Sequence, residues 1–264
     1  MDLQLNDKRA LVTGSTAGIG LAIAVSLARE GAAVVVNGRT QKRVDEAIEQ
    51  VKRAVPDAKV KGIAADLSTS EWVPALLRQL PGVDILVNNL GIFEPKPFAE
   101  IPDEDWRRFF EVNVLSGVRL SRAYLPGMLQ RNWGRVVFIS SESALNIPVE
   151  MIHYGVTKTA QLALARGLAE TTVGTGVTVN SVLPGPTRSE GVDKFLEDLA
   201  RSRGTNAAEV EADFFKTARP TSLLRRFATT DEVASMVTYV CSARASATNG
   251  AALRVDGGVV RSVI

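Results

Sequence analysis

The sequence has 264 residues, 45% of them hydrophobic, and its 31 Lys and Arg residues against 29 Asp and Glu leave a formal net charge of +2. This composition predicts an ordered globular protein with a sizeable core, and a charge so near balance gives nucleic acid or an anionic membrane little to hold. The single Cys241 excludes an internal disulfide and the single His153 excludes ordinary His-clustered zinc sites, although a carboxylate site for magnesium stays open.

Seven short runs rich in β-branched residues alternate with longer segments of helical character. The runs cover residues 10–13, 33–37, 60–65, 83–89, 135–140, 177–183 and 252–256. Most are too apolar to alternate with a period of two, which is typical of strands covered on both faces. The alternation predicts a doubly wound parallel sheet of about seven strands with helices on both faces, as a single domain over residues 1–264. Ligands of such sheets bind outside the carboxyl ends of the strands, where the strand order reverses.

The first strand leads into a glycine-rich turn, TGSTAGIG, at residues 13–20, which opens a long helical segment. Glycines let the backbone approach a pyrophosphate, and the free N–H groups at a helix N-terminus attract its charge. The glycine spacing differs from the usual G-x-G-x-x-G, but the strand-turn-helix context favours a dinucleotide site. The expected cofactor contacts here are Gly14, Ser15, Thr16, Gly18, Ile19 and Gly20.

The second strand ends in VNGR at residues 36–39. A dinucleotide fold that prefers NAD places a carboxylate here for the ribose 2′-OH, whereas an arginine accommodates a 2′-phosphate. Position 38 is glycine and Arg39 follows it, so a guanidinium is available and no carboxylate repels the phosphate. The pattern favours NADP(H) as cofactor, with NAD(H) possible if Arg39 is only a solvated surface charge.

The segment from about 186 to 228 breaks the regular alternation, because some 45 residues separate a strand from the next clear helix, where 2 to 6 is usual. It holds two amphipathic helix candidates, at 191–204 and 207–220. Their apolar residues include Phe195, Leu196, Leu199, Phe214 and Phe215. Since the segment starts at a strand's carboxyl end, we expect a substrate lid; the alternative is a decorative surface insertion.

The stretch MIHYGVTKTAQL at 151–162 places Tyr154 and Lys158 on one helix face. A nearby ammonium favours the phenolate and lowers the pKa of a tyrosine toward working pH, which suits a general acid or base. Packing of a tyrosine beside a snorkelling lysine produces the same spacing. Ser141, at the carboxyl end of the fifth strand, supplies a third group where the sheet places ligands. His153 points about 100° away from Tyr154, so we expect it to pack, as we do Cys241.

Four motifs stand in the order and at the spacing of the short-chain dehydrogenase/reductase family. They are TGSTAGIG, NNLG at 88–91, Ser141 with YGVTK at 154–158, and LPGPTRS at 183–189. The sequence resembles this family over essentially its whole length, including its reductases of 3-oxoacyl groups on acyl carrier protein. The resemblance implies a Rossmann-like fold and NAD(P)-dependent oxidoreduction at a CH–OH group.

The same resemblance implies four catalytic residues. Tyr154 would protonate the carbonyl oxygen in reduction, and Lys158 would lower the pKa of the tyrosine and hydrogen-bond the nicotinamide ribose. Ser141 would polarise the substrate oxygen, while Asn113 would fix a water that links the lysine to solvent. The cofactor would carry the hydride.

Further cofactor contacts follow by matching motifs. Asp66 would hydrogen-bond the adenine, although an N-cap of the following helix explains an aspartate there equally well. Asn89 and Gly91 would line the cleft, and Thr187 would contact the carboxamide. The remaining expected contacts are Leu67, Pro184, Gly185 and Ser189, together with Tyr154 and Lys158 themselves.

The sequence departs from the family pattern at Leu90, where alanine is common, and at Asn132 and Thr175, where acyl-carrier reductases carry arginines. Sugar acids, acyl thioesters, steroids and small ketones all stay open as substrates. Two other functions also stay open: an NAD-dependent alcohol dehydrogenase and a non-catalytic dinucleotide-binding regulator.

The resemblance implies a homo-oligomer, a tetramer or a dimer, paired through the helices that bear Asn113 and Tyr154 and present Ala160 and Ala163. The first residues, MDLQLNDKRA, hold no apolar core of a signal peptide, and no run approaches the roughly 18 apolar residues of a membrane span. We therefore expect a cytoplasmic protein, without nucleic acid, membrane or metal, that acts on a small molecule.

Overall fold

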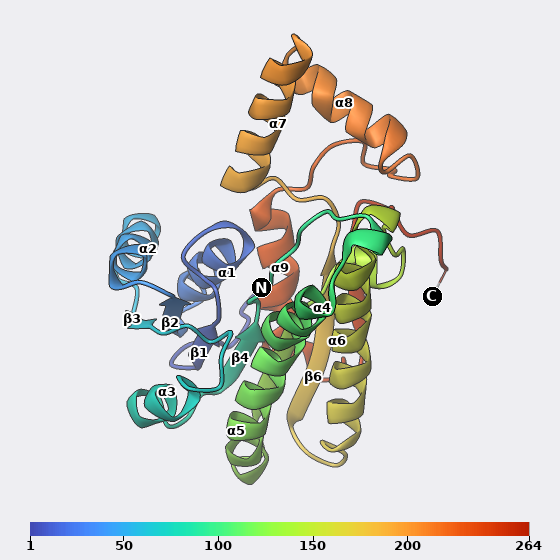
Figure 1. The fold of residues 1–264 in the computed structure, drawn as a ribbon. Coiled ribbons are helices and arrows are strands. Elements are labelled where there is room, and N and C mark those ends of the chain that lie inside the picture. Colours follow the sequence, from blue (N-terminus) through green and yellow to red (C-terminus); the bar gives the residue numbers. More distant parts are fainter. Residues whose placement is uncertain (264) are drawn as a thin grey trace.

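Seven parallel strands form one sheet in the order β3-β2-β1-β4-β5-β6-β7 (Figure 1). The strands are β1 (Arg9–Val12), β2 (Ala33–Gly38), β3 (Val60–Ala64), β4 (Ile85–Asn88), β5 (Gly134–Ile139), β6 (Val177–Pro184) and β7 (Ala252–Val255). The structure, a computed structural model, describes residues 1–263, and the side chains at 190 and 195 lie outside its description. The predicted doubly wound sheet is confirmed, and its order reverses between β1 and β4.

Helices cover both faces of this sheet, each over its own hydrophobic core. One core joins the sheet to α1 (Gly18–Arg29), α2 (Gln41–Ala54) and α9 (Thr230–Val240). The other joins it to α3 (Val73–Gln79), α5 (Ser116–Gln130) and α6 (Ile152–Glu170). Within β1, Ala10 and Val12 enter the first core and Leu11 the second, as the strand period of two requires.

A π-helical turn interrupts the long helical segment that begins at Asp103. The chain runs from α4 (Asp103–Phe110) through η2 (Glu111–Leu115) directly into α5. A π turn adds one residue to the helical repeat, and such turns are common at functional sites. Here it contains Asn113. Short turns elsewhere are η1 (Phe98–Glu100), η3 (Glu142–Ala144), η4 (Val149–Met151) and η5 (Ala243–Ala245).

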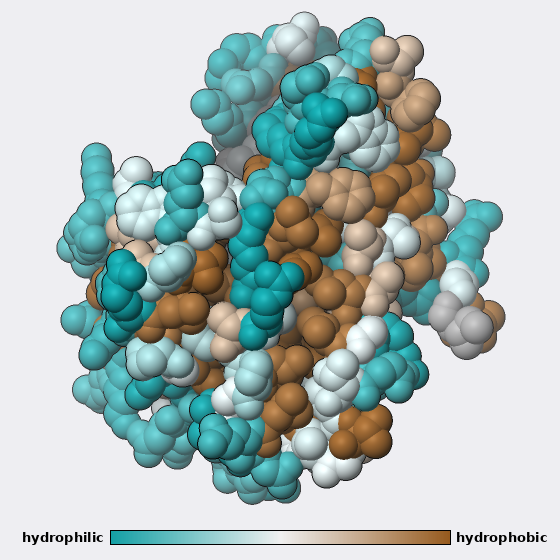
Figure 2. Space-filling view, turned by 60° about the horizontal axis from the view of Figure 1, so that its bottom comes forward, coloured by the Kyte–Doolittle hydropathy of each residue, from teal (hydrophilic) through white to brown (hydrophobic). Residues whose placement is uncertain are grey.

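An apolar groove of about 440 Å³ runs along the outer surfaces of α5 and α6. Its apolar lining comes from Val118, Leu125, Leu129, Leu164 and Leu168. Figure 2, which turns the lower part of Figure 1 forward, shows hydrophobic side chains gathered across this side of the molecule. Among residues 1–263, no helix has both the length and the apolar character needed to cross a bilayer.

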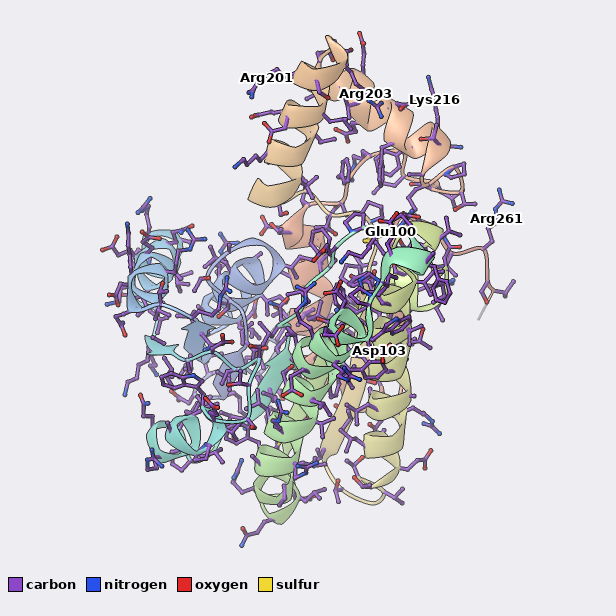
Figure 3. All side chains as sticks on the ribbon, in the orientation of Figure 1. Glu100, Asp103, Arg201, Arg203, Lys216 and Arg261 are labelled. Carbon is purple, nitrogen blue, oxygen red and sulfur yellow. The ribbon has the colours of Figure 1, made fainter. Side chains whose placement is uncertain are left out.

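The segment 186–228, called the insert below, forms α7 (Glu190–Arg203) and α8 (Ala207–Thr217) as the sequence predicts. The Ser189 hydroxyl caps α7, and Gly204 ends it in the left-handed conformation, with φ 65°. The insert has its own apolar cluster, formed by Leu196, Ala200, Val210, Phe215 and Phe227. Both helices stand beyond the carboxyl edge of the sheet (Figure 1). Arg201 and Lys216 point outward from them (Figure 3), whereas Arg203 reaches from α7 to Asp213 on α8, 3.0 Å away. The expectation for Phe195 falls on a side chain outside the description.

Candidate active site

The glycine-rich turn leaves the N-terminus of α1 open. Gly14 and Gly18 adopt the left-handed conformation, with φ 58° and 55°, and no side chain caps the helix. Ser15 donates from its hydroxyl to the Val12 carbonyl, 2.7 Å away, which holds the turn against β1. The uncapped amides and the positive end of the helix dipole therefore fit a cofactor pyrophosphate.

Gly20 is required by close packing inside the turn. A Cβ atom there would lie 2.5 Å from Asn89 Nδ2 and 2.6 Å from the Gly14 carbonyl. The Asn89 amide donates to the carbonyls of Thr13 and Gly14, at 2.9 and 3.1 Å. Asn89 therefore holds the turn in shape. Leu90 follows it with its main-chain amide bonded to the Thr13 hydroxyl at 2.9 Å, and its side chain packs on the second core.

Asn37 is a structural residue of this site that the sequence analysis did not single out. Its carboxamide oxygen accepts from the Gly14 amide, 3.3 Å away, and its Nδ2 donates to the carbonyls of Ile63 and Ala65, each at 3.1 Å. The side chain is buried. The sequence signal for this role was a polar residue, Asn37, at the end of an otherwise apolar, valine-rich strand.

The end of β2 presents a glycine, Gly38, followed by an exposed arginine. A Cβ at Gly38 would come within 2.4 Å of Thr16 Cγ2, so this position cannot carry the carboxylate typical of NAD sites. Arg39 is exposed, and within the described residues no hydrogen bond or ion pair engages its guanidinium.

Asp66 lies at the carboxyl end of β3, where its Oδ1 accepts from the Ser68 amide at 3.1 Å and from the Ser68 hydroxyl at 2.6 Å. The expected helix N-cap is wrong, because α3 begins only at Val73 and Asp66 instead closes a turn. The adjoining Leu67 is buried in the second core. The exposed side of Asp66 stays open to an adenine.

The structure brings together Ser141, Tyr154, Lys158 and Asn113, all of which were predicted from sequence. Ser141 follows β5, and its hydroxyl accepts from the Ser143 amide at 3.1 Å. A hydrogen bond with Ser141 acts to lower the pKa of Tyr154, an effect smaller than the rise that burial causes. Lys158 lies one turn along α6, with its ammonium 5.6 Å from the centroid of the tyrosine ring.

Lys158 is buried and anchored to the sheet. Its ammonium donates to the Ile139 carbonyl at 2.9 Å and lies 3.4 Å from Gln161 Oε1. Burial lowers the pKa of Lys158 to about 8. A Cβ at Gly91 would sit 3.4 Å from this ammonium and 3.5 Å from Asn113 Oδ1, so glycine keeps the space between them clear.

Asn113 is held on three sides. Its Oδ1 accepts from the Ile92 amide at 2.8 Å, and its Nδ2 donates to the Ile92 carbonyl and to the Thr157 hydroxyl, both at 3.0 Å. The π turn leaves its main-chain carbonyl free to accept from Gln161 Nε2 at 2.6 Å. Gln161 thereby links Asn113 with Lys158, a role the sequence analysis missed.

The expected lowering of the Tyr154 pKa by Lys158 is not what the structure shows. Burial raises the pKa of Tyr154 to about 12, although the hydrogen bond with Ser141 acts to lower this pKa. The lysine is itself desolvated, and its charge is directed at Ile139. The exposed ring of Phe93 packs edge-on to Tyr154, with 6.3 Å between the ring centroids.

The last motif follows β6 at the base of the insert. A Cβ at Gly185 would lie 2.7 Å from Asp256, so only glycine lets this turn pack against the residue after β7. Thr187 donates from its hydroxyl to the Gly185 carbonyl at 2.9 Å. Ser189 lies near the glycine-rich turn: a Cβ placed on Gly18 would be 3.8 Å from the Cβ of Ser189. Pro184, which ends β6, pairs with β7.

His153 and Cys241 pack as expected. The imidazole lies 4.0 Å from the ring of Phe109, centroid to centroid, and burial lowers its pKa. Cys241 is fully buried, and burial raises the pKa of its thiol to about 12.

Fold and site together define a dinucleotide-dependent oxidoreductase. Residues 8–200 match the family model described as short chain dehydrogenase, and the chain belongs to the short-chain dehydrogenase/reductase family, whose members act on alcohol and ketone groups. It is 52% identical to the uncharacterized oxidoreductase YvaG of Bacillus subtilis over all of both chains. It is 33% identical to D-beta-hydroxybutyrate dehydrogenase of Cupriavidus necator, over 97% of this chain and 99% of that one. L-sorbose reductase of Gluconobacter frateurii, solved with NADPH and L-sorbose, matches all of both chains with a TM-score of 0.93 and 31% identity.

Proposed function

We propose that this enzyme uses NADP(H) to interconvert a carbonyl and a secondary alcohol, with Ser141, Tyr154, Lys158 and Asn113 as its catalytic residues. The observation that carries the proposal is the meeting of a serine hydroxyl, a phenol and a buried ammonium beside the open N-terminus of α1. A proton donor and a dinucleotide cradle at one edge of a sheet suit hydride transfer.

In reduction, the substrate oxygen accepts hydrogen bonds from Ser141 and Tyr154, and the phenol gives up its proton to that oxygen. When bound, the cofactor supplies the hydride to the carbonyl carbon, so hydride and proton together convert the ketone to the alcohol. A pKa of about 12 keeps Tyr154 protonated and ready to donate. Behind Tyr154, Lys158 and Asn113 supply polar groups along which a proton can return to the phenol.

Arg39 and Gly38 support NADP(H) over NAD(H). An unpaired guanidinium beside a position that admits no carboxylate matches a 2′-phosphate, and a phosphate accepts two hydrogen bonds from such a group. The L-sorbose reductase that resembles this chain was solved with NADPH, in agreement with this choice.

We propose that the insert is a substrate lid and that its substrate has an apolar or neutral polar body. Arg188, at its start, is already paired with Asp193 and Glu211, at 2.8 and 3.1 Å, which leaves it little capacity for an anion. Phe93 offers an exposed ring beside Tyr154. Asn132 accepts from the Gly176 amide at 2.7 Å and has no charge for an acyl carrier.

The apolar groove on α5 and α6 supports a homo-oligomer, with a second copy covering it. We place the enzyme in the cytoplasm because its one cysteine is buried and forms no disulfide, as is usual in a reducing compartment. Light scattering of the eluting protein tests the assembly: a mass of one chain would contradict it.

The function is tested by titrating the purified protein with NADPH and NADH, then screening carbonyl reduction with the tighter-binding cofactor. The panel holds one compound for each open substrate class, namely 5-oxogluconate, acetoacetyl-CoA, an oxosteroid and acetoacetate, together with the ketose L-sorbose. We expect tighter NADPH binding and turnover of at least one ketone. Tighter NADH binding would favour the NAD-dependent alternative, and binding without turnover would favour the regulatory one.

A further inference from the structure

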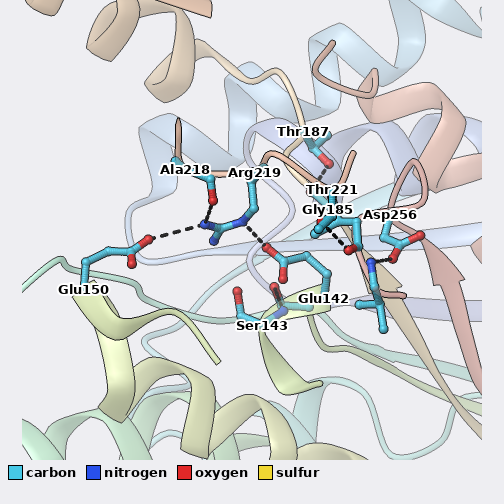
Figure 4. Close-up of polar contacts among 12 residues, drawn as sticks. Glu142, Ser143, Glu150, Gly185, Thr187, Ala218, Arg219, Thr221 and Asp256 are labelled. Carbon is cyan, nitrogen blue, oxygen red and sulfur yellow. Dashed lines mark hydrogen bonds and ion pairs between the residues drawn. The ribbon is translucent and has the colours of Figure 1, made fainter. Parts of the chain in front are cut away.

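A buried ion pair joins the catalytic loop to the insert. Glu142 directly follows Ser141 and is 3% exposed, and Arg219, two residues beyond the end of α8, is 8% exposed. Arg219 Nε lies 2.8 Å from Glu142 Oε1 (Figure 4). The second oxygen of Glu142 is buried and has no hydrogen bond to a described residue. Arg219 is therefore the cation that balances the negative charge of Glu142.

Arg219 reaches the loops on both sides of the catalytic pair. Its Nη1 lies 3.4 Å from Glu150 Oε1, in the turn just before α6 and Tyr154, and 2.9 Å from its neighbour's carbonyl at Ala218 (Figure 4). The guanidinium carbon also lies 6.0 Å from the ring of Phe214 on α8. One side chain thus touches the loop after Ser141, the turn before Tyr154 and the insert.

Stability alone gives little reason for this arrangement. A buried ion pair often contributes no more to folding than apolar residues of the same size, because both charges must leave water. The insert already has its apolar cluster, and two main-chain hydrogen bonds hold its base: Arg188 N–H to the Ala228 carbonyl at 2.8 Å, and Ala228 N–H to the Pro186 carbonyl at 2.9 Å. The pair therefore points to a role in the site.

We propose that Arg219 is a positioning residue that, through Glu142 and Glu150, sets the placement of Ser141 and Tyr154 and couples it to the insert. The proposal deepens the proposed function and rests on it. Arg219 acts through its contacts with Glu142 and Glu150, which lie in the two loops that carry Ser141 and lead to Tyr154. A shift of about 1 Å in such a constellation costs on the order of 100-fold in rate.

The two charges also act on the tyrosine in opposite directions. Glu142 raises the pKa of Tyr154 and Arg219 lowers it, after the larger effects of burial and Ser141. Asp256 raises the pKa of Glu142 in turn, although burial is the main cause of that rise and Arg219 opposes it. Removing either Glu142 or Arg219 alone therefore shifts the pKa of Tyr154. Removing both leaves that pKa near its original value, because the two effects cancel.

The test measures alcohol oxidation against pH with NADP⁺ and the alcohol form of the ketone turned over in the screen. Because oxidation needs the phenolate, its rate rises with pH. We expect Arg219→Ala to reduce kcat about 10- to 100-fold and to displace the profile to higher pH. Glu142→Gln displaces it to lower pH, and Arg219→Lys recovers part of the rate. The Kd for NADPH stays within about threefold of wild type in all three. An equal loss at every pH, with no displacement in either variant, would overturn the proposal.

A second arm needs no turnover and so separates this proposal from the proposed function. Amide hydrogen exchange of residues 141–151 is followed in wild type and in the double variant Glu142→Gln/Arg219→Gln, which leaves neither charge of the pair buried alone. The control is Arg201→Ala, which removes an exposed arginine of α7. We expect faster exchange in the double variant only. Wild-type exchange in the double variant would contradict the positioning role, even if no ketone is found.

Discussion

The ammonium of Lys158 lies 5.6 Å from the ring of Tyr154, yet it donates its hydrogen bond to the carbonyl of Ile139, 2.9 Å away. Burial moves the two pKa values apart, to about 12 for the phenol and about 8 for the ammonium. Between these values the pair consists of a neutral acid and a neutral amine. This arrangement suits donation of a proton by the phenol, whereas the oxidation direction needs a positive charge that stabilises the phenolate.

The depressed pKa of Lys158 predicts a pH-dependent stability. Between pH 8 and 10.5 the unfolded chain holds a proton on this lysine that the folded chain has lost, so the free energy of unfolding rises with pH in that window. The rise is at most about 1.4 kcal/mol per pH unit. It is measured by urea unfolding of wild type and Lys158→Met at pH 8 and 9.5. A difference that does not change with pH would show that the lysine titrates normally.

Tyr154→Phe removes the proposed proton donor while preserving the ring that packs beside Phe93. We expect turnover to fall by about 10²- to 10⁴-fold, the usual contribution of general acid catalysis. The Kd for NADPH should change by less than about threefold. Tyr239→Phe, which removes a half-exposed hydroxyl on α9, is the matched control and should keep full activity. Undiminished turnover in Tyr154→Phe would remove the tyrosine from the mechanism.

Arg39→Ala tests the choice of cofactor. Losing charge-assisted hydrogen bonds to a 2′-phosphate costs about 1.5 to 3 kcal/mol, so NADPH should bind about 10- to 100-fold more weakly while NADH is unaffected. The comparison is Arg53→Ala, which removes an exposed cation from the far end of α2. Fluorescence titration with both nucleotides gives the result. If the ratio of NADPH to NADH affinity stays the same, Arg39 does not contact the phosphate.

Gly18→Ala tests the cradle separately from the phosphate reader. The new Cβ meets protein atoms only at 3.8 Å, so its effect comes from backbone strain at φ 55° and from crowding of the pyrophosphate. We expect both nucleotides to lose affinity by a similar factor, about tenfold or more. Gly174→Ala carries similar strain, at φ 75°, in a turn with no atom within 4 Å. It should lower the melting temperature comparably and leave both Kd values unchanged; equal nucleotide loss in both variants would attribute the effect to stability.

The fold was predictable because its signals are local. Apolar β-branched runs define strands, and Gly204 and Asn206 mark where α7 ends and α8 begins. The proposed catalytic residues follow from motif spacing, since Tyr154 and Lys158 share a helix face whatever surrounds them. The titration of the pair was not predictable, because desolvation depends on what covers it, and neither Phe93 nor the Ile139 carbonyl was expected there.

The π turn and the buried ion pair escaped the sequence for a different reason. The chain leaves the α-helical pattern at Asn113. The main-chain carbonyl of Asn113, which an α-helix would engage, accepts a hydrogen bond from Nε2 of Gln161, 48 residues later. Glu142 and Arg219 are 77 residues apart, and each alone looks like an ordinary charged residue. A carboxylate placed directly after the catalytic serine was the one local hint.

The separate apolar cluster of the insert has an evolutionary consequence. Leu196, Val210 and Phe215 contact one another and not the two cores that hold the sheet, so substitutions among them leave the strands, the glycine-rich turn and α6 untouched. Such a segment diverges at its own rate and can be exchanged between relatives as a cassette, provided that an arginine at its exit still meets the glutamate after the serine. New substrate preferences can then arise on an unchanged hydride-transfer platform.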